Sequence, residues 1–403
     1  MLFGILYFIA ILIMLVYSII KCNVITSFLI GYYLLIAGFS LYAGSQGIIQ
    51  IEQTTIWGYM LLIIAYLLFF RPWMNSKKIV NFNKTDYSKI NNFKPFCYVY
   101  IFASIVTIYV YFTRISAYIK SGNWSMIRFQ HYQGETERVY SNIFEQYCIL
   151  ISLYLFLLAV LVGMLMLKKK RNSILAYAML ASAVISNIMQ ALYVAGRGSI
   201  FEELLLVIAI FLFVMKGIKK QKTFIMISLL VALAVVIVPI IMSISESRFS
   251  NDSENEFLRY FGESPVVFNN NVATIEWPAM GKMCLSTFFD TGFSQVEIGG
   301  TWGVRFFTFV GYIYIDWGFI GVFLLGGFFG CYFFNRLIRK KTYRISDLYL
   351  LFFYYQTLLK GGLVIGRSYL TTVVYTIIIY CFIRFVIEDS IFQRLFSRKS
   401  QRI

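Results

Sequence analysis

Long apolar runs separated by short polar connections dominate this chain of 403 residues. A membrane-spanning helix needs roughly 20 consecutive apolar residues, and most of the runs are close to that length. Strands of about ten alternating residues, which a transmembrane barrel would show, do not occur. We therefore expect an all-α polytopic membrane protein, a single integral membrane domain over residues 1–403. The pattern predicts eleven spans, near residues 1–20, 23–44, 56–70, 96–113, 148–167, 173–195, 200–215, 223–243, 306–335, 347–361 and 369–386.

The ninth apolar run, 306–335, is too long for one span at about 1.5 Å per residue. Asp316 and Gly318 interrupt this run. We expect a short external helix first and the true span from about Trp317.

The connections between the spans alternate sharply in charge. One set, with Lys168-Lys169-Lys170-Arg171 among its members, holds most of the 36 Lys and Arg residues and few of the acidic ones. Short basic loops stay in the cytoplasm. This pattern places the amino terminus outside and the carboxyl terminus in the cytoplasm, and it puts the long segments 114–147 and 244–305 outside as the cover of an active site.

Composition narrows the function classes. Hydrophobic residues make up 59% of the chain and charged residues 14%, whereas a soluble domain is about 45–50% apolar and about 25% charged. The net charge of +17 lies in loops that set the topology, so it does not indicate nucleic-acid binding. The six cysteines are scattered and the chain has one histidine, so neither a metal site nor any other cofactor is expected.

Two glycine-flanked arginine turns lie on the expected outer side. Gly196-Arg197-Gly198-Ser199 joins the sixth and seventh spans, and Gly366-Arg367-Ser368 joins the tenth and eleventh. Backbone N–H groups at a helix start combine with an arginine into an anion site. Alternatively, Arg197 only reaches headgroup phosphates, and Ser199 with Glu202 only caps the helix. The repetition of the turn at one membrane face favours anion binding.

Further candidates lie in or beside the two long outer segments, where loops on a rigid scaffold usually carry function. Alternative roles stay open: Arg305 as an interface anchor, His131 as a structural residue, Asp316 as an N-cap and Glu263 as a surface charge. As ligands of an anionic group we expect Arg128, Arg248, Arg259 and Arg305, and as a general base His131, Glu263 or Asp316.

Four stretches of the chain share features with a known family of membrane proteins. They are Ala195-Gly196-Arg197-Gly198-Ser199, Leu258-Arg259-Tyr260-Phe261-Gly262, Thr301-Trp302 through Asp316-Trp317-Gly318-Phe319-Ile320-Gly321, and Gly366-Arg367-Ser368. Through them the chain resembles the O-antigen and capsule repeat-unit polymerases of bacterial inner membranes (the Wzy type). The third stretch is similar to the family's Asp-aromatic-Gly-x-x-Gly pattern opening a span. The family's plan of ten to fourteen spans with one dominant late periplasmic loop is also similar.

The resemblance implies a GT-C-like, metal-independent glycosyltransferase that extends undecaprenyl-diphosphate-linked oligosaccharides into O-antigen of lipopolysaccharide or into capsule. It implies a chain-length regulator and a flippase as partners, besides the bilayer. Negative charge grows on the departing diphosphate, which preorganised arginines stabilise.

Three alternatives remain. A glycan ligase shares this architecture and differs in its acceptor. A lipid-oligosaccharide flippase or other transporter would place ionisable groups or broken helices near the midplane. A non-catalytic component of a glycan-export complex would not need two arginine turns on one face.

Overall fold

The computed structural model describes most of the chain and is helical throughout the described part. Within that part the sole β-type pairing is an isolated bridge between Thr85 and Tyr343. The described residues are 2–21, 23–49, 56–74, 85–86, 88–121, 139–169, 173–194, 197–214, 253–272, 278–289, 291, 308–340, 342–363 and 369–389.

The predicted class of polytopic helical membrane protein is confirmed. Over the described residues, seven helices are long and apolar enough to cross a membrane, or eight if one bent pair counts as a single span. Two expected spans fall short of this: α9 (Arg197–Val214) carries an arginine and two glutamates, and α15 (Ile345–Lys360) has 16 residues. The expected span at 223–243 lies outside the described residues.

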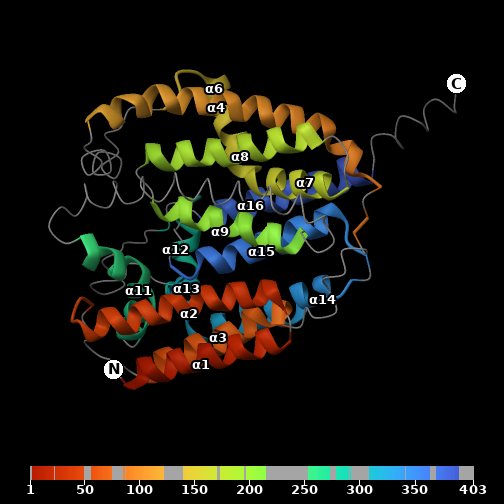
Figure 1. Ribbon diagram of the computed structural model, residues 1–403. Coiled ribbons are helices and arrows are strands. Elements are labelled where there is room, and N and C mark those ends of the chain that lie inside the picture. Colours follow the sequence, from red (N-terminus) through yellow and green to blue (C-terminus); the bar gives the residue numbers. More distant parts are fainter. Residues whose placement is uncertain are drawn as a thin grey trace, which may run out of the picture. The chain divides into compact units, whose positions relative to one another are not determined.

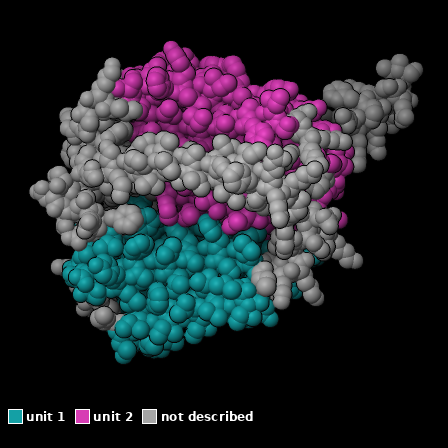
Figure 2. Space-filling view, viewed as in Figure 1, with its two compact units in different colours: residues 1–81, 254–341, 354–374 teal, residues 82–253, 342–353, 375–403 magenta. Residues whose placement is uncertain are grey.

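The chain divides into two compact units (Figure 2). Unit 1 comprises residues 1–81, 254–341 and 354–374, and unit 2 comprises residues 82–253, 342–353 and 375–403. Residues of α15 and of α16 (Tyr369–Cys381) belong partly to each unit.

Unit 1 is built on three neighbouring helices, α1, α2 and α3 (Figure 1). Its core is rich in buried tyrosines whose hydroxyl groups reach backbone carbonyls: Tyr33 donates to the Leu358 oxygen at 2.6 Å. The buried ring contributes apolar contact area, and the hydrogen bond satisfies its polar hydroxyl. The helices of unit 1 are α1 (Leu2–Ile20), α2 (Val24–Ser45), α3 (Ile56–Met74), α11 (Ser253–Asn271), α12 (Lys282–Leu285), α13 (Phe309–Leu325), η5 (Gly326–Phe333) and α14 (Phe334–Ile338).

Unit 2 packs α4 against α6 and α8 (Figure 1). Small hydroxyl side chains line this contact: Ser152 donates to Ser186 at 2.8 Å, and the Tyr100 hydroxyl donates to the Ser152 carbonyl at 3.1 Å. Such residues let membrane helices approach closely and bond across the interface. The helices are η3 (Ile90–Phe93), α4 (Lys94–Ser121), α6 (Ile143–Tyr154), α7 (Phe156–Lys168), α8 (Ser173–Tyr193), α9 and η6 (Phe382–Glu388).

The expected span at 148–167 is broken. α6 and α7 meet at Leu155 with a bend of 60°. Neither proline nor glycine stands at this point. The Tyr100 hydroxyl bonds the Ser152 carbonyl just before the bend, and a side chain inserted into the helical ladder is a recognised cause of a kink.

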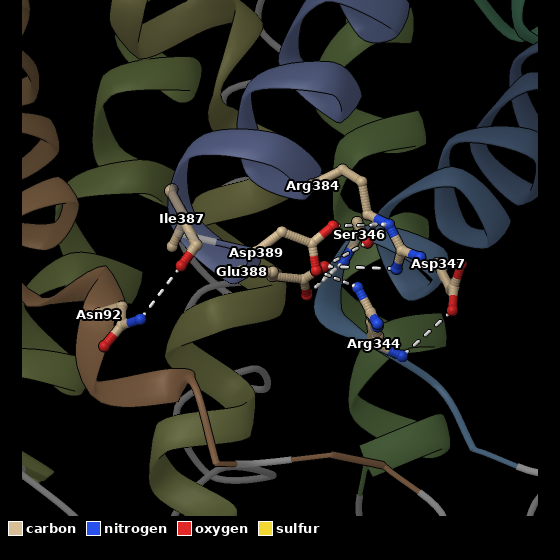
Figure 3. A network of polar contacts seen from close by, with 8 residues as sticks. All are labelled: Asn92, Arg344, Ser346, Asp347, Arg384, Ile387, Glu388 and Asp389. Carbon is tan, nitrogen blue, oxygen red and sulfur yellow. Dashed lines mark hydrogen bonds and ion pairs between the residues drawn. The ribbon is translucent and has the colours of Figure 1, made fainter. Parts of the chain in front are cut away.

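A polar network in unit 2 ties the end of η6 to the start of α15 (Figure 3). The buried Glu388 carboxylate accepts two hydrogen bonds from Ser346, one from the backbone N–H at 3.1 Å and one from the side-chain hydroxyl at 2.6 Å. Arg344 binds Asp389 at 2.6 Å. Both segments border connections that are rich in Lys and Arg, which the sequence pattern predicts to lie in the cytoplasm. The network satisfies N–H groups at a helix start, which would otherwise lack partners.

Candidate functional site

The candidate site lies in unit 1, where α13 breaks at Gly318. This residue has φ 61° and ψ −161°, a non-helical conformation inside the helix that glycine adopts readily. A Cβ at Gly318 would also lie 2.9 Å from the Pro278 ring. The predicted interruption of the apolar run at Asp316 and Gly318 is therefore confirmed.

Asp316, 1% exposed, caps the short helix α12 from the other side of the long loop. Its carboxylate accepts the backbone N–H groups of Met283 at 2.9 Å and of Cys284 at 2.8 Å. The backbone adds a bond from Ala279 N–H to the Ile315 carbonyl at 2.8 Å. Carboxylates are stabilised at helix N-termini by the orphan N–H groups. Asp316 therefore caps α12, whereas Thr308 caps the helix of the ninth span.

The Cys284 thiol reports on this contact. Burial raises the pKa of Cys284 to about 11, and the nearby Asp316 carboxylate contributes to the rise. Both act in the same direction because each disfavours a thiolate.

The residues after Asp316 fit closely around one another. A Cβ on Gly281, which has φ 84°, would lie 2.9 Å from the Trp317 ring, and one on Gly321 would lie 2.1 Å from the Trp317 Cβ. These contacts admit nothing larger than glycine without movement of the tryptophan. The Asp-Trp-Gly-x-x-Gly stretch therefore packs the turn that contains α12 tightly against α13.

The second stretch, on α11, crosses α2 at close range. A Cβ on Gly262 would lie 2.7 Å from the Phe39 carbonyl carbon and 2.8 Å from the Ser40 nitrogen, both backbone atoms. Arg259 Nε lies 3.7 Å from the Glu263 carboxylate one turn further on. The Glu263 side chain is 7% exposed and that of Arg259 is 39% exposed, so the arginine is the partner open to solvent.

Direct bonds link these stretches with the segment before the last arginine turn. The Ser264 hydroxyl donates to the Gly362 carbonyl at 2.8 Å, and the Phe309 N–H donates to the Gly361 carbonyl at 2.8 Å. The Tyr314 hydroxyl donates to the Val272 carbonyl at 3.1 Å. Residues 258–272, 309–321 and 361–363, which are far apart in sequence, thus form one contact region.

Three predicted site residues fall within this region: Arg259 and Glu263, which are paired, and Asp316. Arg197 opens α9, and its side chain lies outside the described residues. In the described part of the chain, His, Cys, Asp and Glu side chains do not gather in groups of three that could hold a metal. The remaining predicted site residues, Arg128, His131, Arg248, Arg305 and Arg367, lie outside the described residues.

Glu203 is a feature that the sequence reasoning did not consider. In unit 2 it lines a cavity of about 20 Å³ together with Phe156, Ile188 and Leu204. The other residues that line this cavity are apolar. The sequence could have indicated Glu203, because it places a carboxylate inside the apolar run 200–215. An ionisable side chain within a membrane span costs free energy and usually has a function.

No protein-family model, curated protein or solved structure matches this chain.

Proposed function

We propose that this protein is a membrane glycosyltransferase that polymerises undecaprenyl-diphosphate-linked oligosaccharide repeat units into O-antigen or capsular polysaccharide. It works at the outer face of the bacterial inner membrane, with its amino terminus outside and its carboxyl terminus in the cytoplasm. One observation carries the proposal: hydrogen bonds join α11 directly after the stretch 258–262, the part of the third stretch at 309–314, and the segment before Arg367 into one contact region.

The reaction forms one glycosidic bond and breaks one bond to phosphate. An acceptor hydroxyl oxygen attacks the anomeric carbon of the growing chain, the carbon–oxygen bond to the lipid diphosphate breaks, and its electron pair leaves with the diphosphate. The hydroxyl proton passes to a general base. Arginines stabilise the departing charge, because their planar fork matches phosphate oxygens. Arg259 contributes a partly exposed guanidinium on α11.

The contacts of Asp316 and Glu263 distinguish these two residues from His131 as candidates for the general base. Asp316 accepts two backbone N–H groups, and Glu263 lies beside the Arg259 guanidinium. Both Asp316 oxygens are thereby engaged by backbone N–H groups, and Glu263 is held by an arginine, so neither carboxylate is open to the proton of an acceptor hydroxyl. We therefore assign Asp316 and Glu263 to positioning, and His131 to the base among the residues that the sequence nominated.

The test uses purified enzyme with lipid-linked repeat units, read as a ladder of products. Arg197→Lys and Arg367→Lys should both shorten the ladder, because lysine keeps the charge but loses the bidentate grip on phosphate. Arg339→Lys, at an exposed arginine on the expected cytoplasmic side, is the matched control and should extend chains normally. Normal ladders from both site variants would leave these arginines as headgroup anchors and contradict the diphosphate role.

A flippase is the second candidate, favoured by the broken α6–α7 helix and by Glu203 beside a cavity. Deletion of the gene, followed by electrophoresis of the surface glycan, distinguishes the classes. Loss of a polymerase leaves single capped repeats, whereas loss of a flippase leaves none. Loss of a ligase leaves polymer on its lipid carrier.

A further inference from the structure

The turn at residues 280–289 is unusually apolar for a segment outside the spans. Met280 is 64% exposed, Phe289 66%, Phe288 45% and Leu285 41%. Four large apolar side chains are thus exposed within ten residues, and an aqueous loop seldom keeps so much apolar surface uncovered. Something apolar therefore covers this turn.

The surface continues directly into the apolar face of α13. Trp317, whose ring packs on Gly281, is 45% exposed. One turn onward, Ile320 is 69% exposed and Leu324 is 67% exposed, within a helix long and apolar enough to span a membrane. Tryptophan is enriched where a span meets the headgroup region. The turn thus begins at the level where the exposed stripe of α13 enters the bilayer.

The backbone at Met280 is a second, independent observation. Met280 has φ 51°, a left-handed conformation that costs a residue with a Cβ of this size. Glycine or asparagine would occupy the position with less strain. The chain keeps a large apolar side chain there and points it outward. Strained residues persist where the side chain has a task.

We propose that residues 280–289 form an interfacial turn whose apolar side chains insert into the acyl region of the adjacent leaflet, with bilayer lipid as the partner. The exposed Lys282 suits this placement, because a lysine stem lies along apolar surface while its ammonium reaches headgroup phosphates. The bonds from Asp316 to α12 then hold the turn at a fixed depth. This inference does not depend on the proposed enzymatic activity.

Spin labelling in lipid nanodiscs of phosphatidylethanolamine and phosphatidylglycerol tests the proposal. Single cysteines at Phe289 and, separately, at Met280 are labelled with a nitroxide, in a chain whose six native cysteines are replaced. Collision with oxygen, which concentrates in lipid, is compared with collision with a water-soluble nickel chelate. Leu324→Cys provides the lipid reference and Ser141→Cys, at an exposed position before α6, the aqueous one.

We expect the labels at Phe289 and Met280 to show oxygen-to-nickel accessibility ratios near that of Leu324 and well above that of Ser141. Ratios equal to that of Ser141 would place the turn in water and overturn the proposal. Immobilised labels that neither reagent reaches would mean that protein covers the turn, and would overturn it as well. Both labelled sites are mostly exposed, so the substitutions leave the core of unit 1 untouched.

Discussion

Replacing Asp316 with asparagine separates a capping role from a catalytic one. The carboxylate makes two hydrogen bonds to backbone N–H groups of α12, at 2.9 and 2.8 Å. A hydrogen bond to a charged group contributes about 1.5–3 kcal/mol net. Asparagine keeps one acceptor oxygen but loses the charge, so Asp316→Asn should weaken the attachment of α12 by about 2–3 kcal/mol.

Cys284 provides the readout, because its N–H is one of the two donors and its thiol lies beside the carboxylate. Its pKa of about 11 lies two units above the ordinary value of 9.0, through burial first and Asp316 second. Only the thiolate reacts, so complete release would accelerate maleimide labelling by up to about 100-fold at pH 8. We expect Asp316→Asn to reach part of this range and Asp316→Ala more of it.

The assay compares labelling rates of folded variants that retain Cys284 as their single cysteine. Asp86→Asn, which removes a mostly exposed carboxylate elsewhere, is the control and should leave the rate unchanged. Thermal unfolding in detergent should show a lower midpoint for the Asp316 variants. If Asp316→Asn abolished chain extension while labelling and unfolding stayed normal, the capping assignment would be refuted and a base role would stand.

The other predictions concern packing and the network of Figure 3. Gly262→Ala should destabilise the protein by about 1–3 kcal/mol, since its Cβ would meet backbone, whereas Gly31→Ala on α2 meets nothing within 4 Å and should be neutral. Equal unfolding midpoints in detergent would contradict the close crossing. Glu388→Ala should lower the free energy of unfolding by about 3 kcal/mol, because its buried carboxylate accepts two hydrogen bonds from Ser346. Asp389→Ala, at a partly exposed ion pair, should lower it by less than about 1 kcal/mol. Unfolding of both variants in denaturant checks the order, and a larger loss for Asp389→Ala would reverse the argument.

Local features of the fold were predictable where a residue type interrupts a pattern. The break in α13 follows from Asp316 and Gly318 inside an apolar run, because a carboxylate and a glycine both disfavour an uninterrupted span. The bend at Leu155 was not predictable, since the run 148–167 contains only one glycine, well past the bend, and no proline. That bend accompanies a contact from Tyr100 on a different helix, and hydrophobic periodicity carries no information about such partners.

The long segment 244–305 also contains a structure that the sequence pattern did not predict. We expected a functional loop, and part of it is the helix α11, whose second half is buried in unit 1. Pro265 and the polar residues around it obscure the helical pattern, while the close crossing at Gly262 and the bond from Ser264 to Gly362 make the helix part of the core. Tertiary packing overrides weak local propensity here.

Carboxylates in the described part of the chain repeatedly accept backbone N–H groups at helix starts. Asp316 accepts from α12, Glu388 accepts from the start of α15, and Glu145 accepts the Ser141 N–H before α6 at 2.6 Å. These N–H groups would otherwise lack a partner, so removing one of the carboxylates changes stability before it changes chemistry. A general base needs room for the hydroxyl or water that it deprotonates. Asp316, whose two carboxylate oxygens both accept backbone N–H groups, is therefore a positioning residue in the proposed reaction.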